Sequence, residues 1–348
     1  MKKFLALLLA LVMSLSLVAC GGGDDTAADG GADAEDGGNA ETAAYQVAMI
    51  TDYGDITDQS FNQTTYEACK AYCEANGVDF NYYKPSGDST AERVAMIEKA
   101  VEEGYTVIVM PGYAFGGAIV ETAPKFSDVK FIALDVSAGD LGDGFEVPDN
   151  LYCAVYQEEL CGYMAGYAAV KMGYTKLGFL GGMAVPAVVR YGYGFVQGVD
   201  AAAADLGLTD VSLNYVYGGQ FFGDADITAV MDTWYAGGTE VVFACGGGIY
   251  TSAVDAAKKV GAKVIGVDVD QAGVIAGYAG VEGMTVTSAM KGLYPTTYDT
   301  LSDVILNDNW SKYAGQIATL GLVSADDPEA NYVQIPMGDG TQWCDTFT

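Results

Sequence analysis

From residue 45 onward, short apolar runs alternate with longer stretches whose apolar residues recur at helical spacing. Uninterrupted apolar runs are typical of strands buried on both faces, and the stretches between them are typical of amphipathic helices. Strands separated by helices predict a parallel sheet that helices cover on both sides. The first set of predicted strands is 45–51, 78–83, 105–112 and 129–135, with helices over 59–76 and about 89–103.

The same alternation starts again near residue 176. Its predicted strands are 176–182, 211–219, 239–248 and 262–270, and its helices lie near 187–206, 225–236 and 249–260. The repetition predicts an α/β fold with two doubly wound parallel-sheet lobes joined by crossing strands. The chain length of 348 residues agrees, because it exceeds what one core usually fills.

Two stretches, 150–173 between the sets and 284–290 after the second set, have the pattern of a strand that leads into a helix. We expect the chain to cross from one lobe to the other at these points, near residues 157 and 287. The predicted first lobe is therefore 45–157 plus about 285–315, and the predicted second lobe is 158–284 plus the C-terminal segment.

The N-terminus has the layout of a secretory signal. Two lysines precede an apolar run that ends at Leu17-Val18-Ala19-Cys20, which resembles a bacterial lipobox. Residues 21–44 hold almost no large apolar residue and predict a flexible acidic tether. We expect residues 1–20 to be a lipoprotein signal peptide and Cys20 to be acylated, for example with palmitate. The protein would then be lipid-anchored on the extracytoplasmic face of the cell membrane; the alternative is an ordinary signal peptide with Cys20 incidental.

Charge and cysteine content exclude several classes of function. Lys plus Arg number 16 against 46 Asp plus Glu, a formal net charge of -30, which would repel nucleic acids and anionic substrates. The chain has no histidine and no CxxC pair, so zinc and redox chemistry have no support. We interpret most of the cysteines after Cys20 as small buried hydrophobic residues, and their disulfide state stays open.

Candidate binding residues lie at the predicted strand ends. Ligands of open α/β sheets bind beyond the carboxyl ends of the strands, where Asp52 and Asp135 follow strands of the first set and Asp268 follows one of the second. These carboxylates are expected to border one ligand-sized space.

A ring and an amide accompany these carboxylates. Asp58 is the predicted N-cap of the helix after the first strand, which places Phe61 and Asn62 in its first turn, on the same rim as Asp52. A flat ring suits an aromatic ligand group, and carboxylates accept hydrogen bonds from vicinal hydroxyls. The combination favours a nucleoside, while the carboxylates would repel the phosphate of a nucleotide.

Five segments resemble the basic membrane protein (BMP) family of substrate-binding lipoproteins, which includes the purine nucleoside receptor of bacterial ABC transporters. They occur in the family's order: "TDYGDITDQSFNQTTYEA", "VKFIALD", "LGFLGGMAVPAVVRYGYGFVQG", "IGVDVDQ" and "TSAMKG". The resemblance implies a type I periplasmic-binding-protein fold that traps its ligand between two lobes. It further implies a monomeric binding protein that delivers a purine nucleoside to ABC permease subunits.

The resemblance also implies a role for each matching residue. It assigns Asp52 to a ribose hydroxyl, Phe61 to stacking on the base and Asn62 to a further nucleoside contact. The remaining matched positions are Asp135, Gly246, Asp268 and Lys291, of which the last two are expected at the ribose or its neighbours. For a second aromatic on the other side of the base, Phe221 is the first choice and Phe222 and Tyr191 are the alternatives; Tyr191 stands where the family usually has phenylalanine.

An enzyme is the first rival interpretation. However, the chain has neither GxGxxG nor a GxxxxGK[ST] phosphate loop, and it lacks both histidine and a GxSxG motif. We therefore expect a binding protein with no cofactor, metal site or nucleic-acid partner. A sugar-binding or signal-binding protein of the same fold remains the second alternative.

Overall fold

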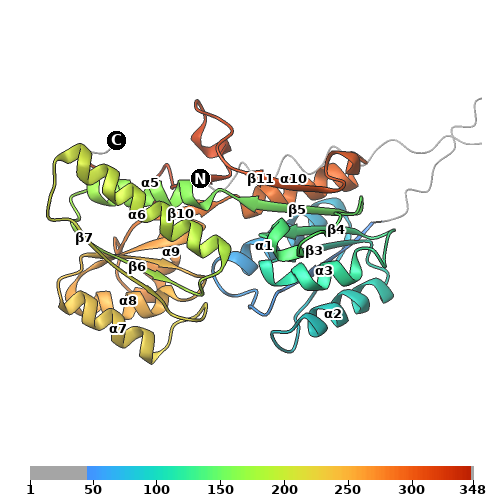
Figure 1. Cartoon of the computed structure of the whole chain (residues 1–348), viewed down its shortest axis with the longest axis horizontal. Helices are drawn as coiled ribbons and strands as arrows, with labels where there is room; N and C mark the ends of the chain where they lie inside the picture. The colour runs from blue at the N-terminus through green and yellow to red at the C-terminus, as the bar shows by residue number, and fades with distance from the viewer. Residues whose placement is uncertain (1–44, 346–348) are drawn as a thin grey trace, which may run out of the picture. The chain divides into compact units, whose positions relative to one another are not determined.

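The computed structural model of the chain describes residues 45–345, which belong to one compact unit. Two six-stranded sheets, each flanked by helices on both faces, form two lobes of this unit (Figure 1). The predicted fold class is therefore confirmed. The signal peptide, the tether and Cys20 lie outside the described residues.

The first sheet is entirely parallel, and its four inner strands are buried on both faces. In sheet order they are β11 (Gln316–Leu320), β5 (Leu151–Tyr156), β4 (Lys130–Leu134), β3 (Val107–Pro111), β1 (Gln46–Ile50) and β2 (Asp79–Tyr83). In β1, Val47 and Met49 face one core while Ala48 and Ile50 face the other. This alternation explains why helices are needed on both sides.

Helices α1 (Phe61–Asn76) and α10 (Leu293–Ile305) cover one face of this sheet, and α2 (Thr90–Glu102) and α3 (Gly116–Thr122) cover the other. The shorter elements are η1 (Tyr113–Phe115), α4 (Ala138–Leu141), η2 (Trp310–Lys312) and η3 (Pro328–Ala330).

The second sheet repeats the plan with one antiparallel edge strand. Its order is β12 (Val333–Gln334), β10 (Thr285–Lys291), β9 (Lys263–Asp268), β8 (Val241–Cys245), β6 (Lys176–Gly181) and β7 (Ser212–Tyr217), with β12 antiparallel to β10. Helices α5 (Glu158–Lys171) and α6 (Pro186–Leu206) cover one face. The other face carries α7 (Ala225–Ala236), α8 (Tyr250–Val260) and α9 (Ala272–Ala279).

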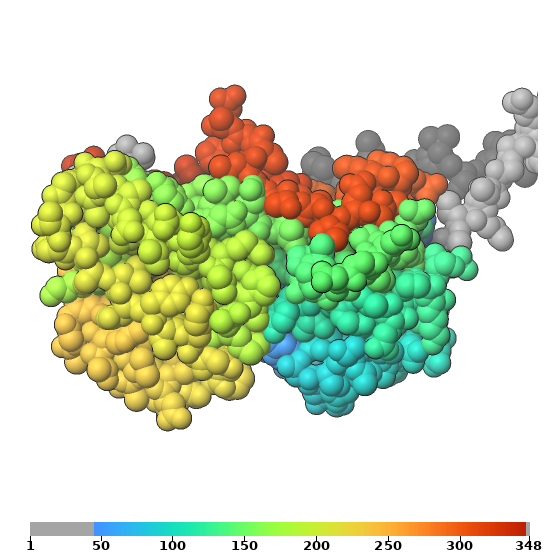
Figure 2. Space-filling model, viewed as in Figure 1, coloured from blue at the N-terminus to red at the C-terminus, as the bar shows by residue number. Residues whose placement is uncertain are grey.

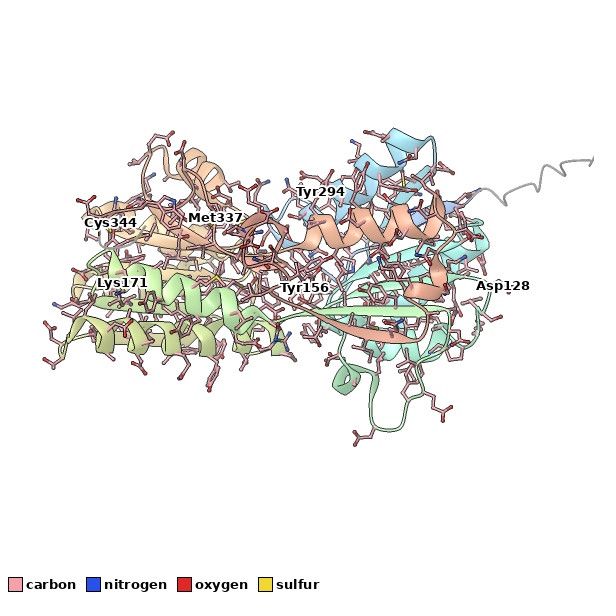
Figure 3. All side chains as sticks on the ribbon, turned by 90° about the horizontal axis from the view of Figure 1, so that it is seen from above. Asp128, Tyr156, Lys171, Tyr294, Met337 and Cys344 are labelled. Atoms are coloured by element: carbon pink, nitrogen blue, oxygen red, sulfur yellow. The ribbon has the colours of Figure 1, made fainter. Side chains whose placement is uncertain are left out.

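The chain crosses between the lobes at three places: between β5 and α5, between β10 and α10, and between β11 and β12. Figure 3 shows Tyr156, the last residue of β5, and Tyr294, at the start of α10, at this junction. Figure 2 shows the surfaces of the two lobes meeting along a seam, where a blue segment from the start of the described chain is visible. One apolar core runs through the junction, because it contains residues of α1 and α10 as well as of α5 and α6.

One predicted lobe boundary differs from the structure. Residues from about 285 were expected in the first lobe, but β10 pairs with β9 and so belongs to the second sheet. The return to the first lobe comes after Lys291, where α10 packs against α1 and β11 joins the sheet. The apolar run of β10 predicts a buried strand, but nothing in it indicates which sheet the strand joins.

Close backbone contact fixes α5 against α6, the helix that carries Tyr191. A Cβ built on Gly162 or Gly166 of α5 would lie 2.3 Å from a backbone oxygen of α6, and Gly194 and Gly198 of α6 approach α5 as closely. The glycines thus allow two parallel helices to pack backbone to backbone.

The cysteine interpretation agrees with the structure. Cys69, Cys73, Cys153, Cys161 and Cys245 are buried thiols without a disulfide, and burial raises the pKa of each. Among residues 45–345, no helix combines the length and the apolar character needed to cross a membrane.

Candidate ligand-binding site

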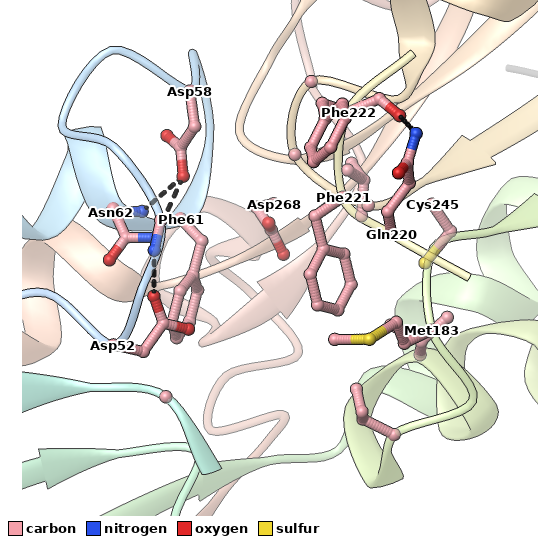
Figure 4. Close-up of a pocket in the computed structure, with 18 of the residues that line it drawn as sticks. Asp52, Asp58, Phe61, Asn62, Met183, Gln220, Phe221, Phe222, Cys245 and Asp268 are labelled. Atoms are coloured by element: carbon pink, nitrogen blue, oxygen red, sulfur yellow. Dashed lines mark hydrogen bonds between the residues drawn. The ribbon is translucent and has the colours of Figure 1, made fainter. Parts of the chain in front are cut away.

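A cavity of about 720 Å³ lies between the lobes, at the carboxyl ends of strands from both sheets (Figure 4). Its volume falls within the range of about 300–1,000 Å³ that is common for small-molecule sites. The structure brings all nine predicted ligand-binding residues to this cavity: Asp52, Phe61, Asn62, Asp135, Tyr191, Phe221, Gly246, Asp268 and Lys291.

The first-lobe wall begins with the capping of α1. Asp58 accepts hydrogen bonds from the backbone N–H groups of Ser60 at 2.9 Å, Asn62 at 2.9 Å and Gln63 at 3.1 Å. The residue at the N-cap position is Ser60, so the prediction that Asp58 occupies this position was wrong by two residues. The carboxylate nevertheless caps the helix, because the chain turns at Gln59 and brings it back over the first turn.

Asp52 and Asn62 both line the cavity and are joined by hydrogen bonds. Asp52 Oδ1 accepts the N–H groups of Tyr53 at 2.7 Å and Gly54 at 2.8 Å. The Asn62 side-chain nitrogen donates to Asp58 at 3.3 Å, and the Asn62 side chain also hydrogen-bonds to the Asp52 carboxylate (Figure 4). Asn62 Oδ1 is buried and has no hydrogen-bond partner among the described residues. Burial raises the pKa of Asp52 in spite of its backbone hydrogen bonds.

The two strand-end aspartates share an unusual backbone conformation. Asp135 follows β4 with φ 60°, and Asp268 ends β9 with φ 64°. Left-handed φ values are uncommon for residues with a Cβ, although Asp tolerates them better than most. Strain of this kind concentrates at functional sites. In both lobes it presents a carboxylate at the end of a buried strand.

Lys291, the last residue of β10, lies among three carboxylates. Its Nζ is 2.5 Å from Asp135 Oδ2, 3.5 Å from Glu158 Oε1 and 3.7 Å from Asp268 Oδ1. The ammonium group also lies 4.6 Å from the centre of the Phe61 ring, which is within cation–π range. The lysine thereby joins carboxylates of both lobes next to the Phe61 ring.

Burial and charge act in opposite directions on this cluster. Burial alone would lower the pKa of Lys291, but Asp135, Asp268 and Glu158 together raise it above its usual value. Burial likewise raises the pKa of Asp135, against the attraction of Lys291. The lysine charge is thus compensated by protein carboxylates. The other cation at the cavity, Lys84, is bound to Asp55 at 2.8 Å.

Glu158 and Arg190 are parts of the site that sequence reasoning missed. Glu158 is fully buried at the start of α5, and its Oε2 accepts from Arg190 Nε at 2.6 Å. Glu158 thus connects Arg190 of α6 to Lys291 of β10. Two features of the sequence could have indicated these residues: an arginine inside the apolar segment "VPAVVRYGYGF" and an acidic pair where the chain crosses between lobes. Neither shows by itself that the two meet.

Phe221 lies across the cavity from Phe61 (Figure 4). Its ring packs on two glycines: a Cβ built on Gly182 would lie 2.4 Å from the ring, and one on Gly246 would lie 3.0 Å from it. The glycines at the ends of β6 and β8 therefore leave room for the Phe221 ring.

Phe222 and Tyr191, the two alternatives for the second aromatic wall, lie in different surroundings from Phe221. Phe222 is 61% exposed at the rim of the cavity. Tyr191 is buried, and its hydroxyl donates to Asp268 Oδ1 at 3.1 Å. The geometry thus favours Phe221 as the second aromatic wall.

A family model described as "ABC transporter substrate-binding protein PnrA-like" matches residues 45–325. The chain belongs to this family. Several curated members are named basic membrane proteins, such as basic membrane protein B of Borreliella burgdorferi, which is 25% identical over 80% of this chain and 78% of its own. The resemblance to the BMP family is thus confirmed.

Two further curated proteins are similar to the chain. The "ABC transporter nucleoside-binding protein BmpA" of Lactococcus lactis is 26% identical over 65% of this chain and 64% of that protein, so the match spans slightly under two thirds of the relative. The "CD4+ T-cell-stimulating antigen" of Listeria innocua is 27% identical over 78% of this chain and 74% of its own.

Solved structures of similar fold include other solute-binding proteins. One from Aeropyrum pernix has a TM-score of 0.71 at 22% identity, covering 84% of this chain and 76% of its own. A sugar transporter protein from Clostridium phytofermentans has a TM-score of 0.57 at 13% identity, covering 79% and 96%. These likenesses concern the fold, which is of the type I periplasmic-binding-protein kind.

We expect Lys291→Met to destabilise the protein strongly. The change leaves three carboxylates without their shared cation, and breaking a buried pair in this way costs about 3–5 kcal/mol. Burial already raises the pKa of Asp135, and the variant also removes Lys291, which lowers it. A carboxyl group whose pKa is higher in the folded than in the unfolded protein destabilises the fold as pH rises. Urea unfolding should therefore show a larger loss at pH 8 than at pH 5.

Lys259→Met is the matched control for this experiment. Lys259 is exposed and pairs with Asp232 at 2.7 Å on the surface, so its loss should cost less than about 1 kcal/mol at either pH. Equal, pH-independent losses for the two variants would contradict the role given to the buried cluster.

Proposed function

We propose that this PnrA-like protein is the extracytoplasmic substrate-binding lipoprotein of an ABC importer. It binds a purine nucleoside in the cavity between its lobes and delivers it to the permease. The observation that carries the proposal is the pair of phenyl rings, Phe61 and Phe221, on opposite sides of a cavity rich in buried hydrogen-bond acceptors.

The two rings suit a flat heterocycle. A base inserted between Phe61 and Phe221 would bury both of its faces, and base–aromatic stacking is worth about 1–3 kcal/mol per contact. A sugar offers its C–H face to one ring but leaves the second with little to stack on. Tyr53 of the first lobe adds a further ring beside Phe221, since their ring centres lie 6.5 Å apart with the planes 30° apart.

The polar groups suit a ligand that donates hydrogen bonds. Asn62 Oδ1 and Asp135 Oδ1 are both buried without a hydrogen-bond partner among the described residues. Such acceptors are costly unless a ligand supplies the missing donors. Ribose hydroxyls and the N–H groups of a purine are donors of this kind. We assign Asp52, Asp268 and Lys291 to the ribose and its neighbourhood, and Gly246 to close backbone approach.

The charges suit a neutral ligand. The ammonium group of Lys291 is already surrounded by carboxylates, and Asp52, Asp135 and Asp268 add negative potential. A phosphate at the cavity would meet repulsion. The name of the Lactococcus lactis relative, a nucleoside-binding protein, agrees with this choice of ligand.

The two-lobed architecture supports the proposed delivery to a permease. We propose that the lobes close on the ligand by hinging at the crossings between them, and that the closed monomer docks on the permease. A lipid anchor on Cys20 would hold the protein at the membrane, on its extracytoplasmic face. The function is binding and needs no cofactor, and the protein is not proposed to be an enzyme.

A thermal-shift assay with several candidate ligands tests which compound the protein binds. Adenosine, guanosine and inosine should raise the melting temperature, because a ligand that binds the folded state stabilises it, whereas ribose and glucose should have little effect. A shift with glucose or ribose alone would replace the nucleoside by a sugar as the ligand. Chromatography of the same samples should recover the nucleoside intact; conversion to base and ribose would reveal an enzyme.

Phe221→Ala should weaken binding of the best nucleoside about 5- to 100-fold, because it removes one stacking surface. Phe222→Ala is the matched control from the next position. Phe222 lies exposed at the rim, so its truncation should change the dissociation constant by less than about threefold. Isothermal titration measures both. A larger loss for Phe222→Ala than for Phe221→Ala would overturn the assignment of the second wall.

A further inference from the structure

Two hydrogen bonds join the lobes beside the cavity. Ser60 Oγ donates to Asp268 Oδ2 at 2.6 Å, and Gln271 Nε2 donates to the backbone oxygen of Gln59 at 3.1 Å. Gln59 and Ser60 precede α1 in the first lobe, whereas Asp268 and Gln271 lie at the end of β9 and the start of α9 in the second. Ser60 and Gln271 are fully buried, and neither lines the cavity.

Gln271 is held in place within its own lobe. Its Oε1 accepts the N–H of Val267 at 2.9 Å, and its backbone N–H donates to Ser288 Oγ at 3.2 Å. Because the side-chain oxygen is bound inside the second lobe, the amide nitrogen points across to the first. The donor is therefore oriented before the lobes meet.

Gln59 and Ser60, the first-lobe partners, are also held in place within their own lobe. Gln59 has a left-handed φ of 58°, which is unfavourable for a residue with a side chain. Gln63 Oε1 accepts from the backbone N–H of Gln59 at 3.0 Å and from its Nε2 at 2.8 Å. Asp58 accepts the N–H of Ser60 at 2.9 Å. These bonds turn the Gln59 carbonyl and the Ser60 hydroxyl toward the second lobe.

We propose that Ser60 and Gln271 form an interlobe latch, which holds the lobes closed over the cavity without touching the ligand. Separating the lobes would break both hydrogen bonds and expose two polar groups that are buried where the lobes meet. The bond from Ser60 ends on a carboxylate, and such charge-assisted bonds are the stronger kind. The latch therefore shifts the balance between open and closed forms toward the closed form.

Ser60 is also a positioning residue for Asp268. Its hydroxyl binds one carboxylate oxygen, while the Tyr191 hydroxyl binds the other at 3.1 Å. One donor comes from each lobe, so the plane of the Asp268 carboxylate is fixed when the lobes are closed. Each oxygen keeps a second lone pair for a ligand hydroxyl.

Single-molecule energy transfer on the full chain tests the latch without any ligand. Dyes are attached through non-natural amino acids at two exposed positions, Glu121 of α3 in the first lobe and Lys258 of α8 in the second. Ser60→Ala should increase the open, low-transfer population. Gln271→Glu should do the same, because its carboxylate still accepts the Val267 N–H but no longer donates to Gln59.

Ser252→Ala is the matched control. Ser252 is equally buried and hydrogen-bonds to Asp224, but both residues belong to the second lobe. This variant should keep the wild-type distribution of transfer efficiencies. If Ser60→Ala and Gln271→Glu, folded by far-ultraviolet circular dichroism, also keep that distribution, the latch is refuted.

Affinity provides a second readout. Apparent affinity scales with the closed fraction, so Ser60→Ala should raise the dissociation constant of the nucleoside about 10-fold, mostly through faster dissociation. Saturating nucleoside should restore the closed population. The affinity change presupposes that the cavity binds nucleosides, as proposed above, whereas the ligand-free distribution does not. A nucleoside that fails to bind therefore leaves the test of the latch intact, and an unchanged dissociation constant for Ser60→Ala would contradict the latch.

Discussion

The floor of the cavity depends on one buried ammonium group, that of Lys291, where the chain leaves β10 for the first lobe. Carboxylates of Asp135 in the first lobe and of Asp268 and Glu158 in the second surround it. None of these charges would be tolerated alone at such burial. Because they compensate one another, the protein can place acidic oxygens beneath a ligand and still fold. Arg190, bound to Glu158, adds a second cation from α6, so three carboxylates face two cations.

The same cluster determines what the cavity can accept. Its one central cation is already paired, so the acceptors that remain, such as Asn62 Oδ1 and Asp135 Oδ1, select for donors rather than for anions. Phe61 and Phe221 add two apolar walls, and the second is seated on Gly182 and Gly246. A neutral ligand with one flat part and one hydroxyl-bearing part satisfies all of these groups at once.

Much of this site could be predicted from the sequence, because parallel sheets bring their carboxyl strand ends to one edge. Asp52, Asp135 and Asp268 follow from that rule, and Phe61 from its place beside a helix start. Pairs that form between lobes could not be predicted. Ser60 and Asp268 lie 208 positions apart, and only the contact between the lobes brings them together. The sheet that β10 joins was misassigned for a similar reason, since a buried strand looks alike in either sheet.

The cavity is proposed as a site for a neutral nucleoside, held by acceptors beside the Lys291 ammonium group, which carboxylates already neutralise. Isothermal titration of inosine and of inosine 5′-monophosphate under the same conditions tests this most directly. Inosine should bind about 100-fold more tightly or better, because the phosphate would meet uncompensated carboxylates. Equal affinity, or tighter binding of the monophosphate, would contradict the account.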